Sequence, residues 1–434
     1  MDKSTVKHKE PIYLGILLIV AGIFLRRLVE LTLVSDMQIE KPAYLALLYA
    51  FQFLSIVAGL FLLIRQPSIK FPRKAELLLA VFSILFTFFL LEIGARAWLN
   101  YVATPDQYDH YVLFTSIDPK EFAWTPHPYL VYSPTPNYKK GQTSHNSLGY
   151  RNDEFPLEKP RNAFRIVALG GSSTYDVSIE DNQKIFTAQL EKLLKEQYGY
   201  QNVEVINAGV PGYNSWEILV NLEFRVLDLN PDLVIIYEGT NDVHARMVDP
   251  SSYRSDDSGR RQPWQVPAVP LWEHSTFLRI LSRMMNFTRQ VSVDDFTSSP
   301  TFFSWPYEYR LSERDISPAE ILEKNPPIYF QRNLENMIAV AKEHGVEVVF
   351  STWAHSPYLN DYASKDYYQQ GFQENNEVVK EVANRHHIPL FDFAAVMPQA
   401  AKYWADGRHI NEAGAREKAT LFAEFIDTQG LIKK

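Results

Sequence analysis

Four short stretches of the sequence bring together residue types that could carry out acyl transfer. They read Gly-Gly-Ser-Ser-Thr at 170–174, Asn-Ala-Gly-Val-Pro-Gly at 207–212, Glu-Gly-Thr-Asn-Asp at 238–242 and Asp-Gly-Arg-His at 406–409. Acyl transfer needs a nucleophile, a base that accepts its proton, a group that orients the base, and donors for the oxyanion. The four stretches together contain all of these residue types.

Ser172 would be the nucleophile in this chemistry, because the glycines before it leave its hydroxyl uncrowded. Asp406 and His409 are three residues apart, so a single turn can place the carboxylate beside the imidazole and fix its tautomer. The amide of Asn241 and the backbone N–H groups of Ser172 and Gly212 are candidate donors to the oxyanion.

Each stretch also has a simpler interpretation when it is taken alone. The sequence at 170–174 could be a plain turn or a loop that binds phosphate, and the Asp-x-x-His pattern could be incidental. The glycine patterns of nucleotide-binding loops do not occur at 170–174, which argues against nucleotide binding. The pair His386-His387 has no carboxylate at a metal-ligand spacing. We therefore expect no cofactor and no metal.

Alternating strands and helices would position these stretches. The predicted strands are short apolar runs at Arg165–Leu169, Val203–Asn207, Leu233–Tyr237, Val346–Thr352 and Pro389–Phe393. Amphipathic helices are predicted between them at Phe186–Gln197, Trp216–Leu227, Tyr329–Glu343 and Gln373–Arg385. This alternation predicts an α/β fold with a parallel sheet covered on both faces. The carboxyl ends of parallel strands share one edge, so the first three stretches should lie close together.

In their order and separations, the four stretches resemble the sequence blocks of the SGNH, or GDSL-type, serine hydrolase family. The resemblance covers about residues 164–425 and leaves out both the first hundred residues and the segment 249–325. It implies a three-layer α/β/α, flavodoxin-like SGNH hydrolase fold with a roughly five-stranded parallel sheet.

The resemblance also implies a role for each site residue. Ser172 would be the nucleophile, His409 its base and Asp406 the group that orients His409. The N–H groups of Ser172 and Gly212 and the amide of Asn241 would form the oxyanion hole.

The sequence departs from the family pattern at two positions, and two alternatives stay open. Gly171 stands where Asp is common and Ser173 where Leu is common. Ser173 could therefore be the attacking hydroxyl in place of Ser172. Separately from these departures, Gly209 is an alternative to Gly212 as an oxyanion donor.

The first hundred residues have the character of a membrane anchor. The segment 44–64 contains no charged residue and has the length that crosses a bilayer core, about 20 residues. The segment 77–99 is similar if Glu92 and Arg96 lie at the interface, and 12–25 is a shorter third candidate. Basic residues before the first segment and between the second and third predict that both regions are cytoplasmic. Three spans would place the rest of the chain outside the cytoplasm, and two would place it inside.

The remaining chain divides by composition. Residues 101–160 are rich in Pro and Tyr and predict a linker of irregular structure or short strands beside the main domain. Residues 161–434 form the predicted hydrolase domain, interrupted at 249–325 by a segment without the α/β rhythm. We expect this insertion to lie over the edge of the sheet, where lids and substrate contacts are often found.

Overall composition excludes some classes of protein. The chain has 434 residues and a net charge of −8, which argues against a nucleic-acid partner. It has no cysteine, so disulfides and thiolate chemistry are impossible.

The sequence as a whole predicts a membrane-anchored serine esterase that acts outside the cytoplasm. Its substrate would be an acylated small molecule, lipid or polysaccharide. An O-acyltransferase that moves the acyl group to an envelope glycan is the second hypothesis, and a non-catalytic glycan-binding or scaffold protein is the third.

Overall fold

The computed structural model describes residues 10–33, 42–67, 73–260, 269–285 and 316–432. The chain divides into two units. The first comprises Met1–Ile117 and Val266–Asp295, and the second comprises Asp118–Gln265 and Phe296–Lys434. Part of the predicted insertion, 261–268 and 286–315, lies outside the described residues.

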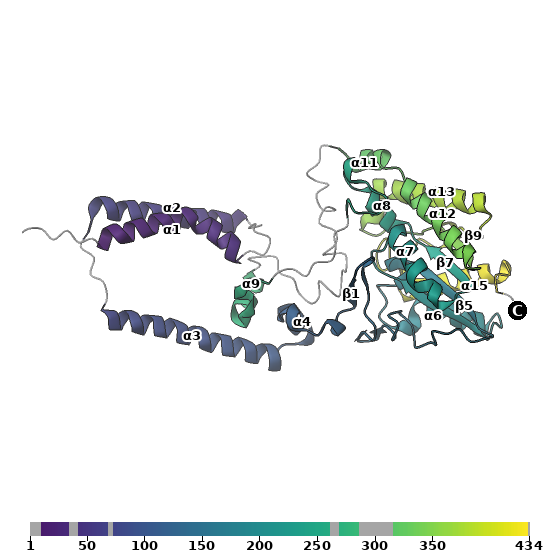
Figure 1. Cartoon of the computed structure of the whole chain (residues 1–434), viewed down its shortest axis with the longest axis horizontal. Helices are drawn as coiled ribbons and strands as arrows, with labels where there is room; N and C mark the ends of the chain where they lie inside the picture. Colours follow the sequence, from purple (N-terminus) through teal and green to yellow (C-terminus); the bar gives the residue numbers. More distant parts are fainter. Residues whose placement is uncertain (1–9, 34–41, 68–72, 261–268, 286–315, 433–434) are drawn as a thin grey trace, which may run out of the picture. The chain divides into compact units, whose positions relative to one another are not determined.

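Helices make up the described part of the first unit (Figure 1). They are α1 (Glu10–Leu33), α2 (Pro42–Arg65), α3 (Lys74–Tyr101), α4 (Pro105–Tyr111) and α9 (Thr276–Met285). By length and composition, α2 and α3 could each cross a membrane, with mean hydropathies of 2.3 and 2.4. A third span at α1 stays a prediction, and so does the topology.

Small residues allow α1 to pack closely along α2. A Cβ atom added to Gly15 would lie 2.8 Å from the carbonyl oxygen of Gly59, and one added to Gly59 would lie 2.6 Å from the carbonyl oxygen of Gly15. The two helices therefore meet backbone to backbone, which is typical of helix contacts in membranes.

Helix α9, from the predicted insertion, belongs to the first unit and packs against α3. The Glu92 carboxylate on α3 accepts hydrogen bonds from the backbone N–H groups of Thr276 and Phe277 at the start of α9, both at 3.0 Å. Arg279 on α9 donates from Nε to the carbonyl oxygen of Tyr111 on α4 at 2.7 Å. Helix α9 therefore links α3 and α4 within the first unit. That the insertion lies over the edge of the sheet stays a prediction.

A five-stranded parallel sheet forms the centre of the second unit, as the sequence predicts. Its strands are β5 (Phe164–Gly170), β6 (Val203–Gly209), β7 (Leu233–Tyr237), β8 (Glu347–Ser351) and β9 (Leu390–Phe391). They lie in the order β6-β5-β7-β8-β9, which is the order of flavodoxin-like sheets. Gly170 is in register with both Gly209 and Tyr237, so three strands end at the same level.

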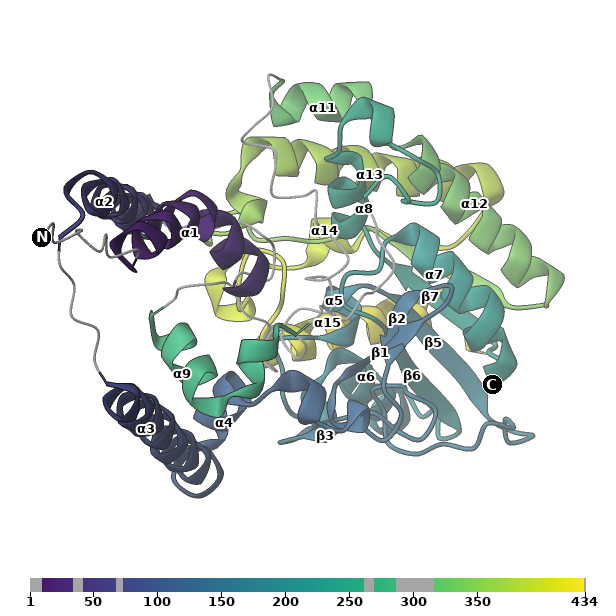
Figure 2. The ribbon, with the colours of Figure 1, turned by 60° about the vertical axis from the view of Figure 1, so that its left-hand side comes forward.

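Helices cover both faces of this sheet, which confirms the three-layer α/β/α class (Figure 2). On one face lie α6 (Phe186–Glu196) and α15 (Glu412–Thr428), which pack against each other. The other face is covered by α7 (Ser215–Asn221), α12 (Ile328–Glu343) and α13 (Asp366–His386).

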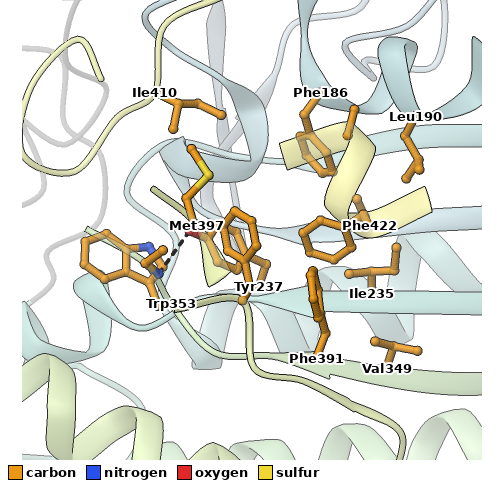
Figure 3. Packing of buried hydrophobic residues seen from close by; sticks show 14 of the residues in the cluster. Phe186, Leu190, Ile235, Tyr237, Val349, Trp353, Phe391, Met397, Ile410 and Phe422 are labelled. Carbon is orange, nitrogen blue, oxygen red and sulfur yellow. Dashed lines mark hydrogen bonds between the residues drawn. The ribbon is translucent and has the colours of Figure 1, made fainter. Parts of the chain in front are cut away.

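The two cores follow from the alternation of side chains along the strands. In β5, Ile166 and Ala168 face the α6–α15 side, whereas Val167 and Leu169 face the opposite side. On the α6–α15 side, Phe186, Phe391 and Phe422 meet in a cluster of rings (Figure 3).

Two predicted helices differ from the observed ones. Helix α13 begins at Asp366, seven positions before the predicted start at Gln373. The prediction missed its first turns because they are polar and contain Gly371. The predicted helix at Trp216–Leu227 ends as α-helix at Asn221 and continues as a π-helical segment, Leu222–Val226.

Short elements complete the second unit. The predicted linker forms two small hairpins, of β1 (Trp124–His127) with β2 (Val131–Pro134) and of β3 (Lys139–Lys140) with β4 (Thr143–Ser144). The short helices are α5 (Ser172–Tyr175), α8 (Thr240–Arg246), α11 (Pro318–Lys324) and α14 (Phe393–Val396).

Candidate active site

Ser172 is the first residue of α5, directly after the turn that ends β5. Asn241 belongs to α8, which follows β7. Strands β5 and β7 are neighbours, and the chain reverses its direction of winding between them. Parallel α/β sheets bind ligands at such a switch point, outside the carboxyl ends of the strands.

Ser172, His409 and Asp406 form a hydrogen-bonded relay. The Ser172 Oγ lies 2.8 Å from His409 Nε2, and His409 Nδ1 lies 2.8 Å from Asp406 Oδ2. The other carboxylate oxygen, Asp406 Oδ1, accepts the backbone N–H groups of Arg408 and His409, both at 2.7 Å. This arrangement can hold the imidazole with Nε2 free to accept the proton of Ser172.

The surroundings of Asp406 favour its charged form. Partial burial raises the pKa of the carboxyl group. The hydrogen bond and charge of His409 and the N–H groups of Arg408 and His409 lower it by more, so the pKa is about 2. The group that orients His409 is therefore a carboxylate throughout the neutral range.

Ser173 is placed differently from Ser172. Its side chain is buried, and its Oγ donates to the carbonyl oxygen of Arg408 at 3.2 Å. Its own carbonyl oxygen accepts a hydrogen bond from Lys418 Nζ at 2.8 Å. Because Ser172 hydrogen-bonds to His409 whereas Ser173 hydrogen-bonds to the Arg408 carbonyl oxygen, the geometry favours Ser172 as the attacking hydroxyl.

The candidate oxyanion residues meet beside the turn that precedes Ser172. Asn241 Nδ2 donates to the carbonyl oxygen of Tyr213 at 2.8 Å, which ties α8 to the turn that contains Gly212. A Cβ atom added to Gly171 would lie 2.4 Å from Asn241 Nδ2. Gly212 has a φ of +81°, a conformation that favours glycine. The structure thus brings Gly212 and Asn241 to the neighbourhood of Ser172.

Gly209 serves another purpose. Its N–H donates to Asn207 Oδ1 at 3.0 Å, so this donor is already engaged. A Cβ atom added to Gly209 would lie 2.4 Å from the backbone nitrogen of Tyr175 in α5. Glycine is needed there for close packing of β6 against α5, so the structure gives Gly209 a role in packing. Gly212 as the oxyanion glycine stays a prediction.

A cleft of about 740 Å³ opens beside His409 and Asp406. Much of its wall comes from the predicted linker, including Trp124, Tyr138 and Lys140. The sequence predicts this segment only as a flank of the main domain. Its density of aromatic residues was the available signal, but the residues that reach the cleft depend on how the hairpins fold back.

Two buried side chains attach this wall to the catalytic turn. His145 Nε2 lies 2.8 Å from the hydroxyl of Tyr175 at the end of α5. The guanidinium of Arg151 donates to the carbonyl oxygens of Tyr175 and Asp176 at 3.0 and 2.9 Å. Arg151 also donates from Nε to the side-chain oxygen of Asn182 at 2.9 Å.

Within the described ranges, no group of three or more His, Cys, Asp or Glu side chains is arranged to hold a metal ion. The expectation that the site works without a metal or cofactor stays a prediction.

Comparison with known proteins supports the family resemblance. Residues 168–417, more than half of the chain, match the model of the GDSL-like lipase/acylhydrolase family. No curated protein matches the chain.

The chain is also similar to solved structures from three bacteria. A lipase/acylhydrolase from Enterococcus faecalis is 20% identical, with a TM-score of 0.38 over 61% of this chain and 96% of that one. A GDSL-like lipase from Bacteroides thetaiotaomicron is 16% identical, with a TM-score of 0.36 over 63% and 91%. A putative lipolytic protein of the G-D-S-L family from Desulfitobacterium hafniense is 13% identical, with a TM-score of 0.36 over 60% and 98%. The assignment depends on the family model: the chain belongs to the GDSL-like lipase/acylhydrolase family.

Proposed function

We propose that this protein is a serine ester hydrolase, associated with a membrane through its N-terminal helices, that acts on acyl esters outside the cytoplasm. The observation that carries the proposal is the relay in which Ser172 Oγ lies 2.8 Å from His409 Nε2, and His409 Nδ1 lies 2.8 Å from Asp406 Oδ2. A hydroxyl with a base and an orienting carboxylate is the arrangement that activates serine for acyl transfer.

The reaction would proceed through an acyl-enzyme. Ser172 Oγ attacks the ester carbonyl carbon while His409 Nε2 takes the hydroxyl proton, and Asp406 stabilises the imidazolium that results. The amide of Asn241 and the N–H groups of Ser172 and Gly212 stabilise the oxyanion. The C–O bond to the alcohol then breaks, and the proton passes from His409 to the leaving oxygen. Water, activated by His409, releases the acid and restores Ser172.

The wall of the cleft supports a substrate that is larger than a simple short-chain ester. The cleft of about 740 Å³ combines aromatic rings, such as Trp124 and Tyr138, with polar groups, such as Lys140 and Thr143. Clefts of about 300–1,000 Å³ accept molecules of the size of drugs or short oligosaccharides. An acylated polysaccharide or an acylated lipid headgroup fits these dimensions and this polarity.

The function is tested by hydrolysis of a short-chain aryl ester by the purified full-length protein in detergent. Wild type is compared with Ser172→Ala and His409→Ala, and Ser173→Ala is the matched control. We expect hydrolysis by wild type and the control and its loss in the other two. Equal turnover in all four proteins would refute the hydrolase proposal and favour a non-catalytic glycan-binding role.

The same assay can test the acyltransferase hypothesis. An oligosaccharide is added as acceptor, and acylated sugar is measured against free acid. Preferential transfer to the sugar would indicate that the sugar, rather than water, is the physiological acceptor. Release of free acid alone would support the hydrolase.

The side of the membrane is tested by a reporter fused after Lys434. A reporter that works only outside the cytoplasm should be active, as three spans require. Activity only from a cytoplasmic reporter would refute the extracytoplasmic site.

A further inference from the structure

Glu238 is a buried acid beside the oxyanion residues that the family resemblance gives no role. It follows β7 directly, and only 4% of its surface is exposed. We propose that Glu238 is a positioning residue whose carboxyl group holds Asn241 and the backbone at Gly171 in the geometry that stabilises the oxyanion. The inference depends on the proposed function, because it concerns the oxyanion site of that reaction.

The contacts of Glu238 converge on Asn241. Its Oε1 accepts the backbone N–H of Asn241 at 2.8 Å, and its Oε2 lies 3.4 Å from Asn241 Nδ2. The carbonyl oxygen of Tyr213 accepts from the same Nδ2 at 2.8 Å. Asn241 is therefore held at its backbone by Glu238 and at its side chain by Tyr213, which leaves the amide little freedom to rotate.

The same carboxyl group fills the space beside the turn before Ser172. A Cβ atom added to Gly171 would lie 2.6 Å from Glu238 Oε2 and 2.4 Å from Asn241 Nδ2. The backbone N–H of Gly171 also interacts with the Glu238 carboxyl group and opposes the rise in its pKa. Glu238 thus connects the loop that follows β5 to the loop that follows β7, the two loops that carry Ser172 and Asn241.

The surroundings of Glu238 favour its uncharged form. Burial raises the pKa of the carboxyl group, as does the like charge of Asp242, while the N–H groups of Asn241, Gly239 and Gly171 partly oppose this, and the pKa is about 8. The phenol of Tyr237 also interacts with it. At neutral pH the carboxyl group is mostly protonated, so it orients Asn241 without adding a negative charge next to the oxyanion.

This arrangement predicts a specific alkaline response. As the pH rises through about 8, Glu238 gains a negative charge beside the oxyanion site, and kcat should fall. Glu238→Gln keeps the volume, the acceptor oxygen and the neutral charge, so it should keep most of the activity at pH 7 and lose the alkaline decline. Glu238→Ala removes the hold on Asn241, so kcat should fall about 10- to 100-fold while KM changes less than about 3-fold.

The experiment measures kcat and KM from pH 6 to 10 for wild type, both Glu238 variants and the control Glu217→Gln. Glu217 is also a buried acid that accepts the N–H of the residue three before it, Asn214, at 2.9 Å. The control should change stability without changing the pH profile. Unfolding of each protein in urea separates a loss of positioning from a loss of fold.

Three outcomes would overturn the inference: an unchanged kcat in Glu238→Ala, an equal loss in the Gln and Ala variants, or an alkaline decline that remains in Glu238→Gln. Ser172→Ala is measured in parallel. If it loses turnover while Glu238→Ala does not, only the positioning role is refuted. If Ser172→Ala turns over like wild type, the proposed function is refuted and the inference with it.

Discussion

Lys418, on the last helix of the chain, donates a hydrogen bond from Nζ to the backbone carbonyl oxygen of Ser173 at 2.8 Å. The ammonium group is buried and stands 3.7 Å from the ring centre of Phe186 and 4.2 Å from that of Tyr237. Burial lowers its pKa to about 8, although the nearby carboxyl group of Asp176 partly opposes this. This buried ammonium group therefore holds the turn that contains Ser172 from the core side.

Replacement of Lys418 by Met should destabilise the second unit. The variant keeps an unbranched apolar side chain but leaves the Ser173 carbonyl group without this donor and removes one of the cations that interact with Asp176. We expect a loss of about 2–4 kcal/mol in the free energy of unfolding, measured in urea. Arg416→Met, an exposed cation on the same helix, should change it by less than about 0.5 kcal/mol. Equal losses in the two variants would contradict a special role for Lys418.

Asp406→Asn should impair catalysis while leaving the fold intact. The amide can still accept the N–H groups of Arg408 and His409, but its Nδ2 would face His409 Nδ1 and favour the wrong tautomer. We expect kcat for a short-chain aryl ester to fall about 10²- to 10⁴-fold. A kcat within about 3-fold of the wild-type value would contradict the role of Asp406 in the mechanism.

His145 should make the stability of the second unit depend on pH below neutrality. Burial lowers its pKa from 6.5 to about 4, and the charges of Arg151 and Arg225 act in the same direction, whereas the hydrogen bond to the Thr135 carbonyl group opposes them. Between these values the unfolded chain binds a proton at His145 and the folded chain does not. The contribution of neutral His145 to the free energy of unfolding is therefore complete above pH 6.5, and about 3 kcal/mol of it is lost as the pH falls to 4.

The measurement is the free energy of unfolding at several pH values between 7 and 4. His145→Gln should flatten this dependence relative to wild type, and the exposed His387→Asn should leave it unchanged. Parallel curves for wild type and His145→Gln would show that other groups produce the acid response.

Gly171→Ala should lower activity because the loop after β5, which contains Gly171, packs closely against the loop after β7. The added Cβ would lie 2.4 Å from Asn241 Nδ2 and 2.6 Å from Glu238 Oε2, so one of these groups must move. We expect kcat to fall about 10- to 100-fold, because a displaced oxyanion donor weakens stabilisation of the transition state. Gly94→Ala, where no described atom lies within 4 Å of the added Cβ, is the control and should keep wild-type activity. Wild-type kcat in Gly171→Ala would contradict the tight geometry of this turn.

The sheet could be predicted from the sequence because its strands are buried on both faces. Continuous apolar runs such as Leu233–Tyr237 can be recognised without knowledge of their neighbours, and that range is the observed strand. Helix α13 was harder to delimit, since the polar residues of its first turns carry no amphipathic pattern around Gly371.

The site could be predicted only in part, because short motifs name residues but not their contacts. The Asp406–His409 spacing is local, and the observed hydrogen bond matches it. The hydrogen bond from Lys418 to Ser173 joins residues 245 positions apart, and the contact between Glu92 and α9 joins residues 184 positions apart. No periodicity in the sequence encodes contacts at such separations.

The central claim is that Ser172 is the nucleophile activated by His409. Its most direct test is labelling of the full-length protein with an aryl fluorophosphonate, followed by peptide mass spectrometry. The expected result is a single adduct on Ser172, formed at the wild-type rate in Ser173→Ala, much more slowly in His409→Ala and not at all in Ser172→Ala. An adduct on Ser173 instead, or equal labelling of wild type and His409→Ala, would contradict it.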